Sequence, residues 1–295
     1  MNANVTSYPD LYRALRGGGN NFGVVTRFDA ITFPQGLMFG ATIAHSGTQQ
    51  AALIQGLVNF TRNSDSDPKG ALEMDFAAIN GTLGAAVDVR YADPILNPPI
   101  LQELLSIPAL RQRVEITTQS ELTLLTEGSI PGGERVLDFT ATFKLDEEFA
   151  NDMVTIFVEE TNSTWNLPGA VPGIQLHPLT NNMLKIMSQN GGNSLGLHAA
   201  DGPLFFIHLA ALWSNPAHDD LMTTAMTNCY QRIVKTAAER DLLNQYQYMN
   251  YANQIQNPPE SYGQESLEML RAVSKKYDPE GVFQTLMPGY FKLWT

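Results

Sequence analysis

The stretch RVLDFTATFKL, residues 135–145, alternates apolar and polar side chains almost without a break. Its apolar positions are Leu137, Phe139, Ala141 and Phe143, and the polar positions between them are Asp138, Thr140 and Thr142. Successive side chains of a strand point to opposite faces of a sheet. The pattern therefore predicts a strand with one face buried and the other open.

Several other segments suggest that this strand has partners in a sheet. Strand-like alternation also occurs in residues 22–33, 71–79, 84–92, 113–122, 203–213 and 245–252. Helical periodicity occurs in residues 10–16, 48–63, 146–165, 215–240 and 263–277. Because the two kinds of segment follow one another irregularly, we expect an α+β fold, an antiparallel sheet backed by helices on one face.

The face of the sheet away from the helices is predicted to be unusually polar. If the apolar positions are covered, the other face presents Glu73, Asp75, Asp88, Arg90, Asp138, Thr140, Thr142, Phe206 and His208. Carboxylates, an arginine and a histidine on one face indicate a lined cavity. An ordinary solvated sheet face remains the alternative interpretation.

The composition excludes several classes of partner. Thirty acidic against 18 basic residues give the 295-residue chain a net charge of −12, which opposes binding to nucleic acid or an anionic membrane. A single cysteine, Cys229, excludes an internal disulfide framework, and the five histidines lack metal-binding spacing, so no metal site is expected. The start, MNANVTSYPD, lacks the features of a signal peptide, so we expect a cytoplasmic protein.

Two glycine-containing motifs do not meet the requirements of the sites that they suggest. In RGGGNNFG, residues 16–23, Phe22 stands where a dinucleotide fingerprint needs glycine, and a strand-like segment follows where a helix is required. GNSLG, residues 192–196, matches a nucleophile elbow, but a helix-like segment precedes it where a strand is needed.

Four stretches together resemble the berberine-bridge-enzyme-like family, fungal FAD-linked oxidoreductases of the vanillyl-alcohol-oxidase type. They are ALRGGGNNFGVVTRFDAITFP (14–34), GGNSLGLHAADGPLFFIHLAALW (191–213), YQYMNYANQIQNPPESYG (246–263) and KKYDPEGVFQTLMPGYFKL (275–293). The resemblance implies that FAD lies against a substrate domain whose antiparallel sheet faces the flavin ring. It implies that Tyr248, Asn250 and Tyr251 lie near flavin and substrate. The residues that correspond to the loop near FAD are Gly17, Gly18, Gly19, Asn21, Phe22 and Gly23.

The resemblance also implies a division of the chain. We expect residues 1–35 to be a remnant of the FAD-binding domain, residues 36–244 to be the substrate-binding domain, and residues 245–295 to be the berberine-bridge-like carboxy-terminal segment. Residues 1–10 supply no pyrophosphate loop and no histidine for covalent flavin attachment. We therefore expect the carboxy-terminal portion of the family with its FAD-binding amino-terminal domain missing, and no cofactor.

Three functions follow from this interpretation. The first is cofactor-independent cyclisation of pericyclic type, isomerisation or elimination of a small secondary metabolite in the sheet cavity. The second is an FAD-dependent oxidoreductase, as a fragment or as half of a two-chain enzyme, in which the glycine loop contacts FAD. The third is a small-molecule binding protein without catalysis. Losing a domain would expose apolar surface on residues 8–34 and 245–295, so we expect a homodimer or higher oligomer through these segments, or a rearrangement that covers them.

Candidate site residues fall into two groups. For proton transfer we expect His208, Tyr248, Asp138 and Asp75, because a desolvated carboxylate or a histidine can act as acid or base. For substrate binding we expect Trp213, Tyr251, Phe206, Asn250, Thr140 and Arg90.

Overall fold

The centre of the fold is one large antiparallel sheet. The computed structural model describes residues 1–124 and 133–294, and within these the sheet has eight strands in the order β4-β1-β3-β2-β6-β7-β5-β8. The strands are β1 Met38–Ser46, β2 Gly70–Ile79, β3 Thr82–Tyr91, β4 Arg111–Thr117, β5 Arg135–Lys144, β6 Val171–Leu179, β7 Leu204–Trp213 and β8 Leu243–Asn244. The predicted antiparallel α+β architecture is confirmed.

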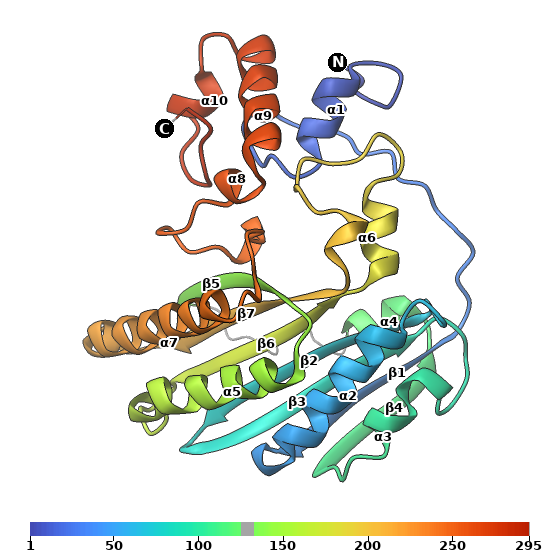
Figure 1. Cartoon of the computed structure of the whole chain (residues 1–295), viewed down its shortest axis with the longest axis vertical. Helices are drawn as coiled ribbons and strands as arrows, with labels where there is room; N and C mark the ends of the chain where they lie inside the picture. The colour runs from blue at the N-terminus through green and yellow to red at the C-terminus, as the bar shows by residue number, and fades with distance from the viewer. Residues whose placement is uncertain (125–132, 295) are drawn as a thin grey trace.

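Three long helices cover one face of this sheet, as Figure 1 shows. They are α2 Gln50–Asn63, α5 Glu147–Thr161 and α7 Asp219–Glu239. The sequence at the start of α5 shows why the helix begins there. The Asp146 carboxylate caps the helix by accepting a hydrogen bond from the Phe149 backbone N–H. Glu147 and Glu148 in the first turn lie at the positive end of the helix dipole. Phe149 then packs edge-on against Phe143 of β5 in the main core. The alternate residues of the strands therefore meet the helices, and their neighbours face away.

A second, smaller core lies at one end of the sheet and joins distant parts of the chain (Figure 1). It contains residues from the amino-terminal stretch, such as Leu11 and Phe22, and from the carboxy-terminal stretch, such as Leu270 and Leu293. The helices around it are α1 Pro9–Leu15, α6 Asn181–Met187, α8 Pro258–Ser261, α9 Gln264–Tyr277 and α10 Val282–Thr285, while α3 Gln102–Leu105 and α4 Gln119–Leu124 lie near β4. No described helix has the length and apolar character needed to cross a membrane.

Two of the expected strands are wrong. Residues 22–33 form no strand, because no described strand lies beside them to pair with their backbone, and Phe28, Ile31 and Phe33 are 84, 90 and 75% exposed. Residues 245–252 form an irregular segment that ends in a 3₁₀ turn, Met249–Tyr251. Conversely, β1 and β6 are strands that the alternation did not single out.

Candidate active site

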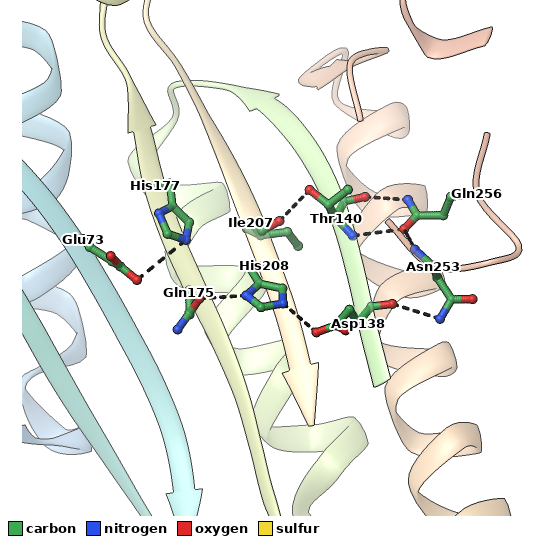
Figure 2. A network of polar contacts seen from close by, with 9 residues as sticks. All are labelled: Glu73, Asp138, Thr140, Gln175, His177, Ile207, His208, Asn253 and Gln256. Carbon is green, nitrogen blue, oxygen red and sulfur yellow. Dashed lines mark hydrogen bonds and ion pairs between the residues drawn. The ribbon is translucent and has the colours of Figure 1, made fainter. Parts of the chain in front are cut away.

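A row of hydrogen-bonded side chains crosses the open face of the sheet at its centre (Figure 2). His208 on β7 lies between Asp138 on β5 and Gln175 on β6, with Nε2 2.7 Å from Asp138 Oδ1 and Nδ1 2.8 Å from Gln175 Oε1. The register explains the row, since His208 is directly opposite Gln175 across the β6–β7 ladder. Both ring nitrogens are engaged, so His208 positions its neighbours and has no free nitrogen to offer a substrate.

Aromatic rings cover this row. The Tyr251 ring stacks on His208 with 3.8 Å between the ring centroids, and Tyr248 meets Tyr251 edge-on at 5.0 Å. Phe206, two residues before His208 on β7, contacts Tyr248 at 5.4 Å and stacks on His177 at 4.6 Å. Burial is the main cause that raises the pKa of the Tyr251 hydroxyl above its usual value. Asn250 does not touch the row, and its amide donates to the Tyr248 hydroxyl.

Acidic groups continue the row across β2 and β3. Asp75 lies opposite Gln175 in the β2–β6 register, and burial, reinforced by the charges of Glu73 and Asp88, raises the pKa of Asp75 to about 7. The Gln175 amide opposes this rise as a hydrogen-bond donor. The Arg90 guanidinium forms an ion pair with Asp88 at 3.0 Å, so its positive charge is balanced within the site.

His177 on β6 is held in its neutral form. Burial lowers its pKa to about 4, and the neighbouring His208 adds to this effect. Its Nε2 lies 4.0 Å from Glu73, which is too long for a hydrogen bond, and the same atom is buried without a partner. An unpaired buried nitrogen beside a cavity is available to a ligand.

A cavity of about 490 Å³ opens at this part of the sheet. Its polar lining comes from Glu73, Asp88, Arg90 and His177, and Phe206 supplies an apolar wall. The volume lies in the range of ordinary small-molecule sites. The polar sheet face is thus hollowed beside the His208 row.

The aromatic cover is fixed to the edge of β5 by two side chains that replace a neighbouring strand (Figure 2). Gln256 accepts from the Thr140 backbone N–H at 3.1 Å and donates to the Thr140 carbonyl at 2.7 Å. Asn253 donates to the Asp138 carbonyl at 2.9 Å. These bonds anchor residues 245–256, and with them Tyr251, over His208.

Two of the expected substrate-binding residues lie elsewhere. Trp213 belongs to the helix-covered face, because it is an odd number of residues from His208 on β7, and its ring is buried in the main core. Its indole N–H donates to Asp219 at the start of α7. Thr140 is on the polar face but completely buried beneath Gln256, with its hydroxyl donating to the Ile207 carbonyl. Neither side chain lines the cavity.

The glycine stretch lines a second cavity of about 590 Å³. Gly17, Gly19 and Gly23 form part of its wall, together with Tyr246 and Tyr248. All three glycines have positive φ, and a Cβ at Gly17 would approach Leu195 to 2.6 Å, so backbone without side chains is required there. Bare backbone and tyrosine faces fit a flat aromatic group such as a flavin ring.

The other residues of that loop have structural roles. Gly18 packs against Phe22, which is buried in the smaller core. Asn21 is fully buried, and its amide donates to the carbonyls of Gly18 and Phe291. Of the six loop residues, only the three cavity glycines could touch a cofactor.

Gln175 and His177 were missed as site residues because β6 was missed. Pro172, Gly173 and Pro178 are residues that disfavour strands and conceal the pattern of VPGIQLHPL. The available signal was the alternation of Ile174, Gln175, Leu176 and His177, with both apolar residues buried in the main core.

Comparisons with known proteins give relatives that extend beyond this chain. No family model matches the sequence. FAD-dependent monooxygenase tpcD of Cochliobolus heterostrophus is 35% identical over 99% of this chain, and FAD-dependent monooxygenase FUP4 of Fusarium proliferatum is 34% identical over 98%. The bifunctional solanapyrone synthase of Alternaria solani is 25% identical over 96%. The chain spans 59, 58 and 54% of these relatives.

Solved structures show the same fold. A BBE-like protein of Physcomitrella patens matches 99% of this chain with a TM-score of 0.70 and 18% identity, and 6-hydroxy-D-nicotine oxidase of Arthrobacter nicotinovorans matches 96% with the same score and identity. This chain covers 62% of each of those chains.

Proposed function

Because the chain belongs to the berberine-bridge-enzyme-like family of FAD-linked oxidoreductases, we propose that it is the substrate-binding part of an FAD-dependent enzyme acting on a small metabolite. The observation that carries the proposal is that a side chain lining one cavity contacts a side chain lining the other. Tyr248 lines the glycine cavity, Phe206 lines the sheet cavity, and their rings are 5.4 Å apart. A flavin ring in the first cavity and a substrate in the second would be neighbours across this pair. FAD-dependent relatives support the cofactor.

The reaction divides between cofactor and chain. Bound FAD supplies a hydride acceptor. Loss of hydride from an alcohol or amine carbon also releases a proton, and the group placed to take it is Glu73, which lines the sheet cavity with its side chain 43% exposed and whose pKa is raised by burial. The Tyr251 ring, stacked on His208, shields the His208–Asp138 pair beside the cavity from water on one side.

The exposed stretch between α1 and β1 would be a contact surface for the domain that binds the flavin. Phe28, Ile31 and Phe33 are almost fully exposed in an unpaired extended segment that runs along the side of the molecule (Figure 1). Soluble proteins rarely leave such apolar patches uncovered. We propose that a flavin-binding domain, in the same or another polypeptide, covers this stretch. A second copy of the chain is the competing occupant.

A second candidate function is favoured by one observation, that titratable side chains of this chain line the sheet cavity. Glu73 and His177 would permit isomerisation, cyclisation or elimination there without a flavin. This candidate predicts turnover by the colourless protein.

The test is reconstitution. The chain is combined with the part of the Cochliobolus heterostrophus relative that it does not cover, supplied with FAD, and mixed without oxygen with a panel of fungal metabolites bearing alcohol or amine groups. We expect at least one compound to bleach the flavin, and Glu73→Gln to retain flavin but slow bleaching by roughly 100-fold or more. Conversion of the same compounds at an equal rate by the flavin-free chain would support the second candidate and overturn the first.

A further inference from the structure

The strands β2 and β6 pair over only part of their length. Their register runs from Ala77–Gly173 to Met74–Leu176 and stops there, although both strands extend further. Pro178, two residues beyond Leu176, has no backbone N–H and cannot donate to a neighbouring strand. The sheet is therefore open between the first residues of β2 and the last residues of β6.

The sheet cavity of about 490 Å³ lies at this opening. Its lining takes consecutive residues from both sides of the gap, 70–73 from β2 and 177–178 from β6. Apolar side chains of Phe60, Met183 and Phe206 supply much of the remaining wall. Such a cavity suits an apolar ring that carries a polar group where the polar side chains of the two strands face each other.

His177 offers an unused ring nitrogen to such a group. Its ring stacks on Phe206, with 4.6 Å between the centroids and 6° between the planes, so the direction of its ring nitrogens is fixed. Nε2 is buried without a hydrogen-bond partner. Burial lowers the pKa of His177 to about 4, so at neutral pH the ring is uncharged and carries one hydrogen. A buried polar atom without a partner is costly, which favours a ligand that supplies one.

Glu73 lies across the gap from this nitrogen. Its Oε1 is 4.0 Å from His177 Nε2 (Figure 2), which is too long for a direct hydrogen bond. An oxygen atom placed about 2.8 Å from both would make two hydrogen bonds at an angle of about 90°. We assign the hydrogen of the neutral ring to Nε2, because the Glu73 oxygen that faces it is an acceptor.

A hydroxyl group matches both partners. It donates to a Glu73 oxygen, which can accept whether or not the carboxyl is ionised, and its own oxygen accepts from His177 Nε2–H. A carbonyl oxygen only accepts, so it gives nothing to Glu73. An ammonium group only donates, so it gives nothing to Nε2–H.

We infer that His177 and Glu73 form a specificity site for a hydroxyl group on an otherwise apolar ring, seated where β2 and β6 part. The inference deepens the proposed function and rests on it for the reaction. When the alcohol is oxidised, its O–H proton passes to Glu73 and its C–H hydride to the acceptor supplied by FAD. The oxygen becomes a carbonyl and keeps its hydrogen bond from His177. His177 is thus a substrate-binding residue that selects alcohols.

The test measures ligand binding to the flavin-free chain. The probes are 2-naphthol and 2-methylnaphthalene, which have nearly the same shape but carry a hydroxyl and a methyl group. We expect 2-naphthol to bind about 10-fold more tightly, because only the hydroxyl satisfies His177 and Glu73. His177→Phe keeps a ring on Phe206 without the nitrogens, so the preference should fall to less than about 2-fold. The exposed His198→Phe is the matched control and should keep the wild-type preference.

NMR of the wild-type chain locates the probe without a variant that might fail to fold. The His177 ring is assigned through its contact with the Phe206 ring protons. We expect the Nε2 signal to shift with 2-naphthol and to stay in place with 2-methylnaphthalene.

Three results would overturn the hydroxyl site: no preference for 2-naphthol in the wild type, a preference retained in His177→Phe, or an unmoved Nε2 signal. Any of them leaves flavin binding by the reconstituted protein intact. A colourless reconstituted protein whose chain still selects 2-naphthol through His177 would overturn only the proposed function.

Discussion

Gln256→Ala should loosen the whole aromatic cover of the candidate site. Its side chain makes four hydrogen bonds: two to the Thr140 backbone, one from the Asn253 backbone N–H and one to the Tyr230 hydroxyl. The residue is 7% exposed, so water does not readily replace these partners. The variant leaves the N–H and the carbonyl of the fully buried Thr140 without partners.

The cost follows from these two orphaned groups. Each buried, unpaired backbone group costs about 1–3 kcal/mol, so Gln256→Ala should lower the free energy of unfolding by about 2–6 kcal/mol. Gln254→Ala, the same substitution at an exposed glutamine two residues away, should change it by less than about 0.5 kcal/mol.

Urea unfolding measures the loss, and amide hydrogen exchange at Thr140 locates it. We expect exchange at Thr140 to accelerate in Gln256→Ala and to stay slow in Gln254→Ala. Equal stability of the two variants, or unchanged protection of Thr140, would refute the view that Gln256 replaces a strand at the β5 edge.

Three further outcomes are expected. The pKa of Asp75 is raised to about 7, so its contribution to stability is complete below about pH 4 and is lost as the pH rises towards 7. Relative to Asp75→Asn, the wild type should lose up to about 4 kcal/mol of unfolding free energy over this range, measured by urea unfolding at a series of pH values. Parallel pH profiles of the two proteins would contradict this. Burial raises the pKa of the Cys229 thiol and removes it from solvent, so a thiol reagent should label it only at the rate of unfolding, and rapid labelling of the folded protein would be inconsistent with this core. Phe28→Glu combined with Phe33→Glu should weaken binding to the flavin-binding part by at least about 10-fold in a binding titration. Stability should not change, because both side chains are exposed. If light scattering shows a dimer that the double variant no longer forms, a second copy of the chain is the occupant instead.

The sequence was informative where one strand face is buried and the other open. In β5 and β7 the alternation placed Asp138 and His208 on the polar face, and the structure brings them to 2.7 Å. The same reasoning assigned Thr140 to that face but could not foresee its burial, because the side chain of Gln256, 116 residues further along, covers it.

The remaining differences have two physical causes. In β6, proline and glycine disfavour a strand in the sequence, but pairing with β2 and β7 on either side holds the segment extended. In residues 22–33, alternation is present but pairing is not, and a strand needs both. The expectation for Trp213 was wrong for a simpler reason, because its odd spacing from His208 on the same strand already assigns it to the helix-covered face.

The visible absorption spectrum of the protein, purified together with the flavin-binding part of a relative, tests the central claim most directly. The account predicts a yellow complex with one flavin per chain. It also predicts that flavin is lost from Gly19→Leu, whose side chain would enter the glycine cavity against Met249, and retained in His208→Asn. A colourless complex, or flavin retained equally in Gly19→Leu, would contradict it.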